Sequence, residues 1–418
     1  MLDVSELPYL TADVLGIGGR IKLRPEDFVV DEVPLYEPCG QGTHVYVRIA
    51  KKRMTTMQAV RHLARALGRP DKDFGYAGLK DAGAVTSQML SLEHVDPARI
   101  EGLAILGLEI LSVSRHTNKL KLGHLRGNRF LIKLRQVDTA RVDVVRAMLA
   151  TLQQRGVPNY FGPQRFGLRG DTWQIGRALV RNDCTEAVAL MLGRPGPADF
   201  GPVRAARELY ERGEYEAAAN AWPHPFANER RACRAVAKAG GNAERAIRAV
   251  DPQMRRFYVS AYQSQLFNQI VAGRINALDR LMAGDLAWRH PQGAVFRVED
   301  VAREQPRCDA FEISPTGPLF GQRMTEPSGE AGEMERVLLA GEGLSPADWR
   351  AEGRRAIRGG RRPLRFCPHD ASVTAGGDDA GEYLELRFFL ESGCYATTVL
   401  REICKTQEDL ASEQPRGE

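Results

Sequence analysis

The order of two hydrophobic periodicities constrains this fold more than any other feature of the chain. Between residues 20 and 50, "DFVVDEV" and "HVYVRI" alternate apolar and polar residues, with Val45, Val47 and Ile49 on one face, and "EYLELRFFL" near the C-terminus does the same. Such alternation is typical of half-buried β-strands. Residues 172–275 are instead rich in Ala, Arg, Glu and Leu, a composition that favours helices. Strands at both ends with helices between them predict a split domain that holds an insertion.

Two helices and a loop are predicted in the first part of the chain. "TTMQAVRHLARALG" predicts an amphipathic helix that Thr55 or Thr56 can cap and that Gly68 ends. "RVDVVRAMLATLQQRG" predicts a helix that ends at Gly156. The following "VPNYFGPQRFGLRGD" is dense in Gly, Pro and aromatic residues, which indicates a loop or the entrance to another domain.

Composition places the chain among ordinary globular proteins. Its 418 residues predict two domains, and 43% hydrophobic with 27% charged residues is an average balance. No apolar run of membrane-spanning length occurs, so we expect no membrane segment, and "MLDVSELPYLTADVLG" does not have the pattern of a signal peptide. Seven scattered cysteines without a C-x-x-C pair predict reduced thiols and a cytoplasmic location.

The motifs that hold common cofactors are missing from the sequence. The histidines and cysteines show no H-E-x-x-H or clustered spacing, so we expect no metal site. No G-x-x-x-x-G-K-[ST] occurs, and "GIGGR" lacks the spacing of a dinucleotide loop. If the chain is an enzyme, the sequence favours chemistry without a cofactor.

Cations lie close to aromatic rings in two segments. In one, which runs from Lys119 to Phe130, the cations precede the ring, and in the other they interleave with rings around Phe161. Cations can bind phosphates while rings stack on splayed bases, so this combination suits RNA recognition. The net charge of +5 agrees with a partner that carries phosphate. A solvated cationic face beside a packed aromatic core is the alternative.

One carboxylate stands out in "DFGYAGLKDAGAVTSQ". Asp81 follows Lys80 and lies between Gly78 and Gly83 in a segment of small neutral residues. Taken alone, an aspartate in this setting is typical of a turn or a helix cap.

Six segments, in the right order, resemble motifs of the TruD family of tRNA pseudouridine synthases. They span residues 21–403 and read "IKLRPEDFVVDE", "FGYAGLKDAGAVTSQ", "KLKLGHLRGNRF", "GVPNYFGPQRFG", "SAYQSQLFNQIV" and "LRFFLESGCYATTVLREI". The resemblance implies an α+β fold: a pseudouridine synthase catalytic domain, with a mixed, mostly antiparallel sheet flanked by helices, and an inserted α/β TRUD domain. The implied boundaries are 1–156 and 363–418 for the catalytic domain and 157–362 for the insertion. Residues 185–250 and 340–362 depart most from the family pattern.

The resemblance also implies a reaction: isomerisation of a uridine to pseudouridine, at position 13 of tRNA, without metal or cofactor. Asp81 matches the catalytic aspartate, which would attack the sugar, attack the base or remove a ribose proton; these alternatives stay open. Lys22 matches the lysine that pairs with this aspartate. Lys80 is then expected to contact an RNA phosphate or to be a surface charge.

The remaining family positions concern substrate binding. Phe130 matches a ring that stacks on the target base, and Asn128 could hold the loop or the nucleotide; the alternative for Phe130 is a strand core residue. Asn159, Phe161, Gln164 and Arg165 are expected to line a cleft between the domains, or else to support the hinge. We expect a monomer whose partner is tRNA. The alternative function is a tRNA-binding or folding protein in which catalysis is incidental.

Overall fold

The computed structural model describes residues 2–350 and 357–406, and the chain divides into two compact units. The split unit contains Tyr9–Val157 and Phe366–Glu418, and the inserted unit contains Met1–Pro8 and Pro158–Arg365. The sequence-based boundaries of 156/157 and 362/363 remain a prediction about the functional domains.

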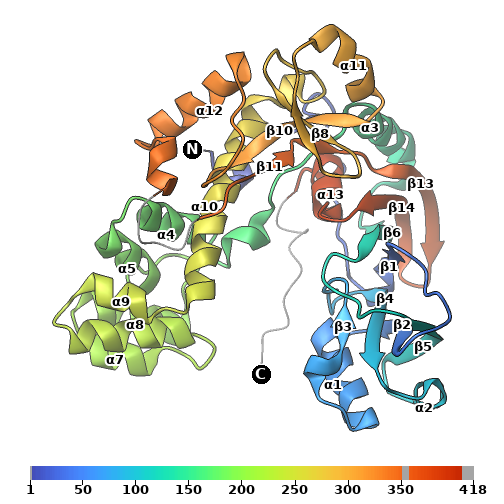
Figure 1. The fold of residues 1–418 in the computed structure, drawn as a ribbon, viewed down its shortest axis with the longest axis horizontal. Coiled ribbons are helices and arrows are strands. Elements are labelled where there is room, and N and C mark those ends of the chain that lie inside the picture. Colours follow the sequence, from blue (N-terminus) through green and yellow to red (C-terminus); the bar gives the residue numbers. More distant parts are fainter. Residues whose placement is uncertain (1, 351–356, 407–418) are drawn as a thin grey trace. The chain divides into compact units, whose positions relative to one another are not determined.

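An eight-stranded sheet forms the centre of the split unit (Figure 1). Its order is β13-β14-β6-β1-β4-β2-β5, with the short β3 paired to β4. β1 and β4 are parallel, and every other pairing is antiparallel, so the predicted mixed, mostly antiparallel sheet is confirmed. The strands are β1 (Phe28–Pro34), β2 (His44–Lys52), β3 (Gly75–Tyr76), β4 (Val85–Glu93), β5 (Leu108–His116), β6 (Leu125–Arg135), β13 (His369–Asp378) and β14 (Gly381–Glu391).

In the described part of this unit, four α-helices accompany the sheet, and their ends follow local sequence signals. α1 begins after Thr55, whose side chain and that of Gln58 form a capping box, and it ends at Gly68 in a left-handed conformation. Its apolar face packs on Val45, Val47 and Ile49 of β2. α3 lies against β13 and α13. The helices are α1 (Thr56–Leu67), α2 (Pro97–Glu101), α3 (Val142–Arg155) and α13 (Ala396–Cys404).

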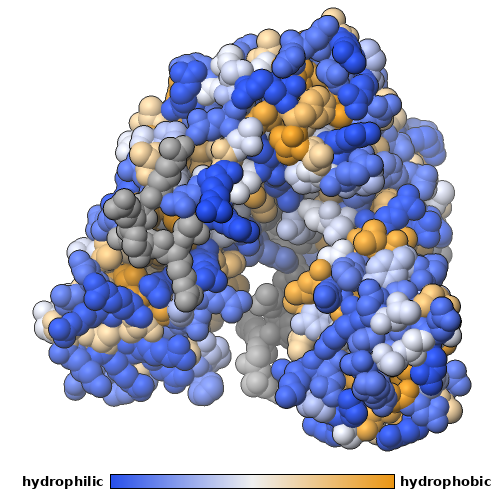
Figure 2. Space-filling model, in the orientation of Figure 1, coloured by the Kyte–Doolittle hydropathy of each residue, from blue (hydrophilic) through white to orange (hydrophobic). Residues whose placement is uncertain are grey.

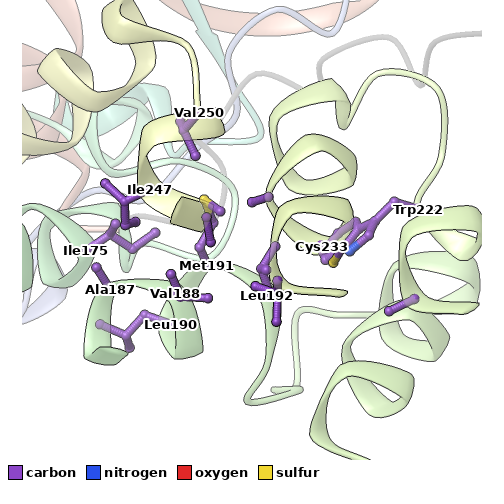
Figure 3. Close-up of a cluster of buried hydrophobic side chains, with 14 of the residues drawn as sticks. Ile175, Ala187, Val188, Leu190, Met191, Leu192, Trp222, Cys233, Ile247 and Val250 are labelled. Carbon is purple, nitrogen blue, oxygen red and sulfur yellow. The ribbon is translucent and has the colours of Figure 1, made fainter. Parts of the chain in front are cut away.

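The inserted unit combines a four-stranded sheet with nine α-helices in its described residues. The sheet order is β11-β10-β8-β9, and the long α10 packs against both α4 and β10. A second core of buried side chains joins the helices of residues 172–258 and includes Met191, Trp222 and Cys233 (Figure 3). The elements are α4 (Thr172–Val180), α5 (Cys184–Leu192), α6 (Gly201–Glu211), α7 (Tyr215–Ala221), α8 (Ala227–Lys238), α9 (Ala243–Ala249), α10 (Pro252–Gly273), β8 (Leu286–Arg289), β9 (Val295–Arg297), α11 (Val301–Asp309), β10 (Ile313–Leu319), α12 (Gly329–Gly341) and β11 (Gly360–Pro363).

Two short strands, β7 (Val157–Pro158) and β12 (Arg365–Phe366), pair where the chain passes between the units. The viewed surface of the protein is mostly hydrophilic, with small separate apolar patches (Figure 2). None of the helices within residues 2–350 and 357–406 combines the length and apolar character that a membrane crossing would need.

Candidate functional site

Asp81 lies in the loop of residues 77–84, between β3 and β4, which we call the Asp81 loop. Its side chain is 46% exposed, so the carboxylate is neither buried nor fully solvated. The backbone amide of Gly83 donates to its Oδ1 at 3.2 Å. Asp81 therefore presents a partly shielded carboxylate just before the first residue of β4, a strand inside the central sheet.

Lys22 forms an ion pair with this carboxylate through Nζ and Oδ2. The lysine precedes β1 and is only 15% exposed. Its backbone is left-handed, with φ of 59°, a conformation that costs an L-residue about 1–2 kcal/mol. The ammonium group also lies 4.6 Å from the ring centroid of Phe28. Lys22 is thus held between the carboxylate and an aromatic ring.

The balance of forces on Asp81 favours its ionised form. Partial burial raises the pKa of Asp81, but the hydrogen bond and charge of Lys22, with the backbone amides of Gly83 and Ala82, outweigh it, so the pKa is below its usual value. Asp81 is consequently a carboxylate at neutral pH and can act as a nucleophile or a base.

The ring of Phe28 lies between this ion pair and Phe130. The centroids of Phe130 and Phe28 are 6.1 Å apart in an edge-to-face arrangement, and Phe388 lies 5.4 Å from Phe130 on β14. Phe130 is half-buried, so part of the residue is open to solvent. The structure therefore connects Asp81, Lys22, Phe28 and Phe130 through successive contacts.

Lys80 differs from the expectation that it contacts phosphate or is a surface charge. Its side chain is 6% exposed, and Nζ lies 2.8 Å from Glu32 Oε2 and donates to Asn128 Oδ1 at 2.7 Å. The expectation was wrong because a carboxylate on the inner face of β1 compensates the buried ammonium group. Lys80 instead links the Asp81 loop to β1 and to Asn128 on β6.

Asn159 and Phe161 are buried in the inserted unit. Asn159 donates to the carbonyl of Pro363 at 2.9 Å and accepts from Arg362. Phe161 exchanges hydrogen bonds with the side chain of Asn268 on α10, at 2.8 Å and 3.0 Å. Both residues are therefore held by contacts inside the inserted unit, and their role at a cleft or a hinge stays a prediction.

Gln164 and Arg165 follow in a short 3-10 turn, Pro163–Phe166. Gln164 is exposed, whereas Arg165 is half-buried and its Nε donates to Ser264 Oγ at 3.0 Å. The guanidinium of Arg165 lies 5.6 Å from the ring of Phe161 and 5.5 Å from that of Phe257. Arg165 is thus attached to α10, and Gln164 is the accessible member of the pair.

Sequence reasoning missed two charged residues near Asp81, although a signal for both was present. Glu32 shares the inner face of β1 with Phe28 and Val30, and Lys51 follows Val47 and Ile49 on the same face of β2. The two-residue period of a strand places an apolar residue at such positions. A charged residue at a buried strand position, where the pattern calls for an apolar one, is therefore a sequence signal for a functional site.

In the part of the chain that the structure describes, no group of three or more His, Cys, Asp or Glu side chains is arranged to hold a metal ion.

Comparison with known proteins agrees with this geometry over nearly the whole chain. The family model of tRNA pseudouridine synthase D (TruD) matches residues 5–403. The tRNA pseudouridine synthase D of Geobacter metallireducens is 48% identical over 401 residues, which cover 96% of this chain and 98% of the relative. That of Anaeromyxobacter dehalogenans strain 2CP-C is 38% identical over 415 residues, which cover 98% of this chain and 100% of the relative.

A solved structure agrees as well. The crystal structure of a TruD protein from Methanosarcina mazei matches with a TM-score of 0.86 at 27% identity and covers 98% of each chain. The match of the family model and the extent of the identity leave one assignment: this chain belongs to the tRNA pseudouridine synthase D (TruD) family.

Proposed function

We propose that this chain isomerises the uridine at position 13 of tRNA to pseudouridine and that Asp81 is its catalytic carboxylate. Membership of the family supports the reaction, and the ion pair between Asp81 and Lys22 is the observation that carries the residue assignment. We further propose that the protein acts as a monomer and that it is located in the cytoplasm. Its seven cysteines form no disulfide, which agrees with a reducing compartment.

The reaction breaks the N-glycosidic bond of the uridine, turns the freed uracil and joins its C5 to C1′ of the same ribose. A carboxylate in the ionised form can start this sequence in three ways: attack on the sugar, attack on the base, or removal of a ribose proton. Each requires a free electron pair on oxygen, and Lys22 keeps Asp81 in that form. In the route that begins with attack on the sugar, the negative charge passes from the carboxylate to the departing uracil, and the cation of Lys22 beside Asp81 would help to stabilise it.

The target base must leave its stack to reach a carboxylate beside the start of β4. Flipping a base costs a few kcal/mol of unstacking, which contact with an aromatic ring can offset. The open part of Phe130, next to Phe28, supports a role in holding the flipped uracil. Lys80 donates to Oδ1 of Asn128, and we propose that the NH2 group of the same side chain donates a hydrogen bond to the nucleotide.

The test uses the purified full-length chain and unmodified tRNA transcripts. We expect carbodiimide labelling followed by primer extension to reveal one new pseudouridine, at position 13, and none in a matched transcript with cytidine at that position. Pseudouridine at a different position would overturn the site of action. The absence of pseudouridine from all tRNA transcripts would overturn the reaction and favour the tRNA-binding alternative.

A further inference from the structure

Lys51 is a buried cation behind the Asp81 loop. It lies near the end of β2, where its neighbours across the strands are Thr86 on β4 and Leu108 on β5. The residue is 2% exposed. Its Nζ donates to the backbone carbonyl of Asp81 at 3.2 Å and to that of Met54, just before α1. We propose that Lys51 is a positioning residue, which holds the backbone of Asp81 so that its carboxylate meets the substrate in the reactive geometry.

The surroundings of Lys51 make its burial costly, so stabilisation of the fold does not explain a lysine at this position. Burying an ammonium group is costly unless a carboxylate compensates it. In the described residues, no carboxylate lies within ion-pair distance of Lys51, and both of its hydrogen-bond acceptors are neutral carbonyls. An apolar side chain at this position would continue the stripe of Val47 and Ile49 without that cost. What an apolar side chain could not do is hold the carbonyl of Asp81.

The charge of Lys51 is sensitive to pH. Burial lowers the pKa of Lys51 to about 8, with the nearby Asp81 opposing this shift and the neighbouring Lys80 adding to it. These are the charged groups that face it from the Asp81 loop, while Thr86 and Leu108 on the flanking strands are uncharged. The ammonium group is therefore present below about pH 8 and is lost as the pH rises through that value. A neutral amine holds a carbonyl less strongly than an ammonium group does.

This inference rests on the proposed function, because it assigns Lys51 a role through the catalytic carboxylate. A displacement of about 1 Å in a reacting group can lower a rate by about 100-fold. Lys51 acts on the backbone of the residue whose side chain reacts, so we expect its loss to affect the chemical step and not tRNA binding.

The test compares Lys51→Met with Lys52→Met, a change at the next residue on the same strand. Lys52 forms an ion pair with Glu26 at the protein surface and does not contact the Asp81 loop. With saturating tRNA in a single turnover, we expect Lys51→Met to lower the rate of pseudouridine formation by about 10- to 100-fold. We expect its tRNA affinity to be unchanged and Lys52→Met to retain the wild-type rate.

The pH profile separates positioning from a merely structural role. The wild-type rate should decline as the pH rises through about 8, and the residual rate of Lys51→Met should lack that decline. A Lys51→Met protein with wild-type rate, or with a rate reduced only in proportion to its folded fraction, would overturn the inference. If Lys51→Met does not fold, Lys51→Gln is measured instead: its neutral amide can still donate to the carbonyl, so it should retain activity but lack the decline near pH 8, and a decline at the wild-type pH would overturn the inference. An inactive wild-type protein would instead contradict the proposed function.

Discussion

At the scale of single residues, the chemistry depends on how Asp81 remains ionised while it is partly shielded from water. Burial raises the pKa of Asp81, whereas Lys22 and two backbone amides lower it. The lowering effects are together the larger, so the pKa lies below its usual value. The contribution of Asp81 to stability is therefore present above its unfolded pKa of about 3.9 and is lost as the pH falls through the lower folded value.

Lys22→Met should move the acid limb of the reaction to higher pH. Without the ammonium group, only the backbone amides of Gly83 and Ala82 oppose the effect of partial burial, so the pKa of Asp81 rises above its value in the wild type. The single-turnover rate, measured between about pH 4 and pH 7, should then decline at a higher pH than in the wild type. An acid limb at the same pH in both proteins would show that Lys22 does not control this ionisation.

At the scale of elements, the start of α1 holds the Asp81 loop. Thr55 caps the helix, and the hydroxyl of the next residue, Thr56, has a different role. It accepts from the backbone amide of Lys80 at 2.8 Å and donates to Gln88 Oε1 on β4 at 2.8 Å. Gln88 in turn donates to the carbonyl of Gly78 at 3.3 Å. The loop is thereby fastened to both α1 and β4.

Thr56→Val should destabilise the protein and slow the reaction. The change keeps the shape of the side chain but leaves the amide of Lys80 and the oxygen of Gln88 buried without their partner, at a cost of about 1–3 kcal/mol. Chemical denaturation and single-turnover kinetics measure the two effects.

Thr55→Val is the matched control for this prediction. It removes the helix cap, at a cost of about 1 kcal/mol, without a contact to the Asp81 loop. We expect it to retain the wild-type rate under conditions in which both variants are folded. Equal rates for the two variants would contradict the role given to Thr56.

At the scale of the whole molecule, local patterns predicted the elements better than their arrangement. The alternation in "EYLELRFFL" identified β14, and Leu384, Leu386 and Leu390 are fully buried. The sheet order, in which β14 lies beside β6, could not be predicted from the same patterns, because pairing between distant strands leaves no local signal. The mixed sheet was predicted from the family resemblance.

The candidate site shows the same limit. Composition alone favoured a turn for Asp81 and a core position for Phe130, and only the resemblance pointed to chemistry. Lys80 was misjudged because its partner Glu32 lies on a strand 48 residues earlier in the chain, outside any local pattern. The alternation of side chains between the two faces of a strand could have revealed the buried charged residues of the site, such as Lys51.

The most direct test of the central claim is pseudouridine formation by purified Asp81→Asn in a single turnover with saturating tRNA. Asparagine has nearly the same shape but no charge, so the fold and tRNA affinity should match the wild type, while product should be undetectable. Asp81→Asn that forms pseudouridine at the wild-type rate would contradict the assignment of Asp81 as the catalytic carboxylate.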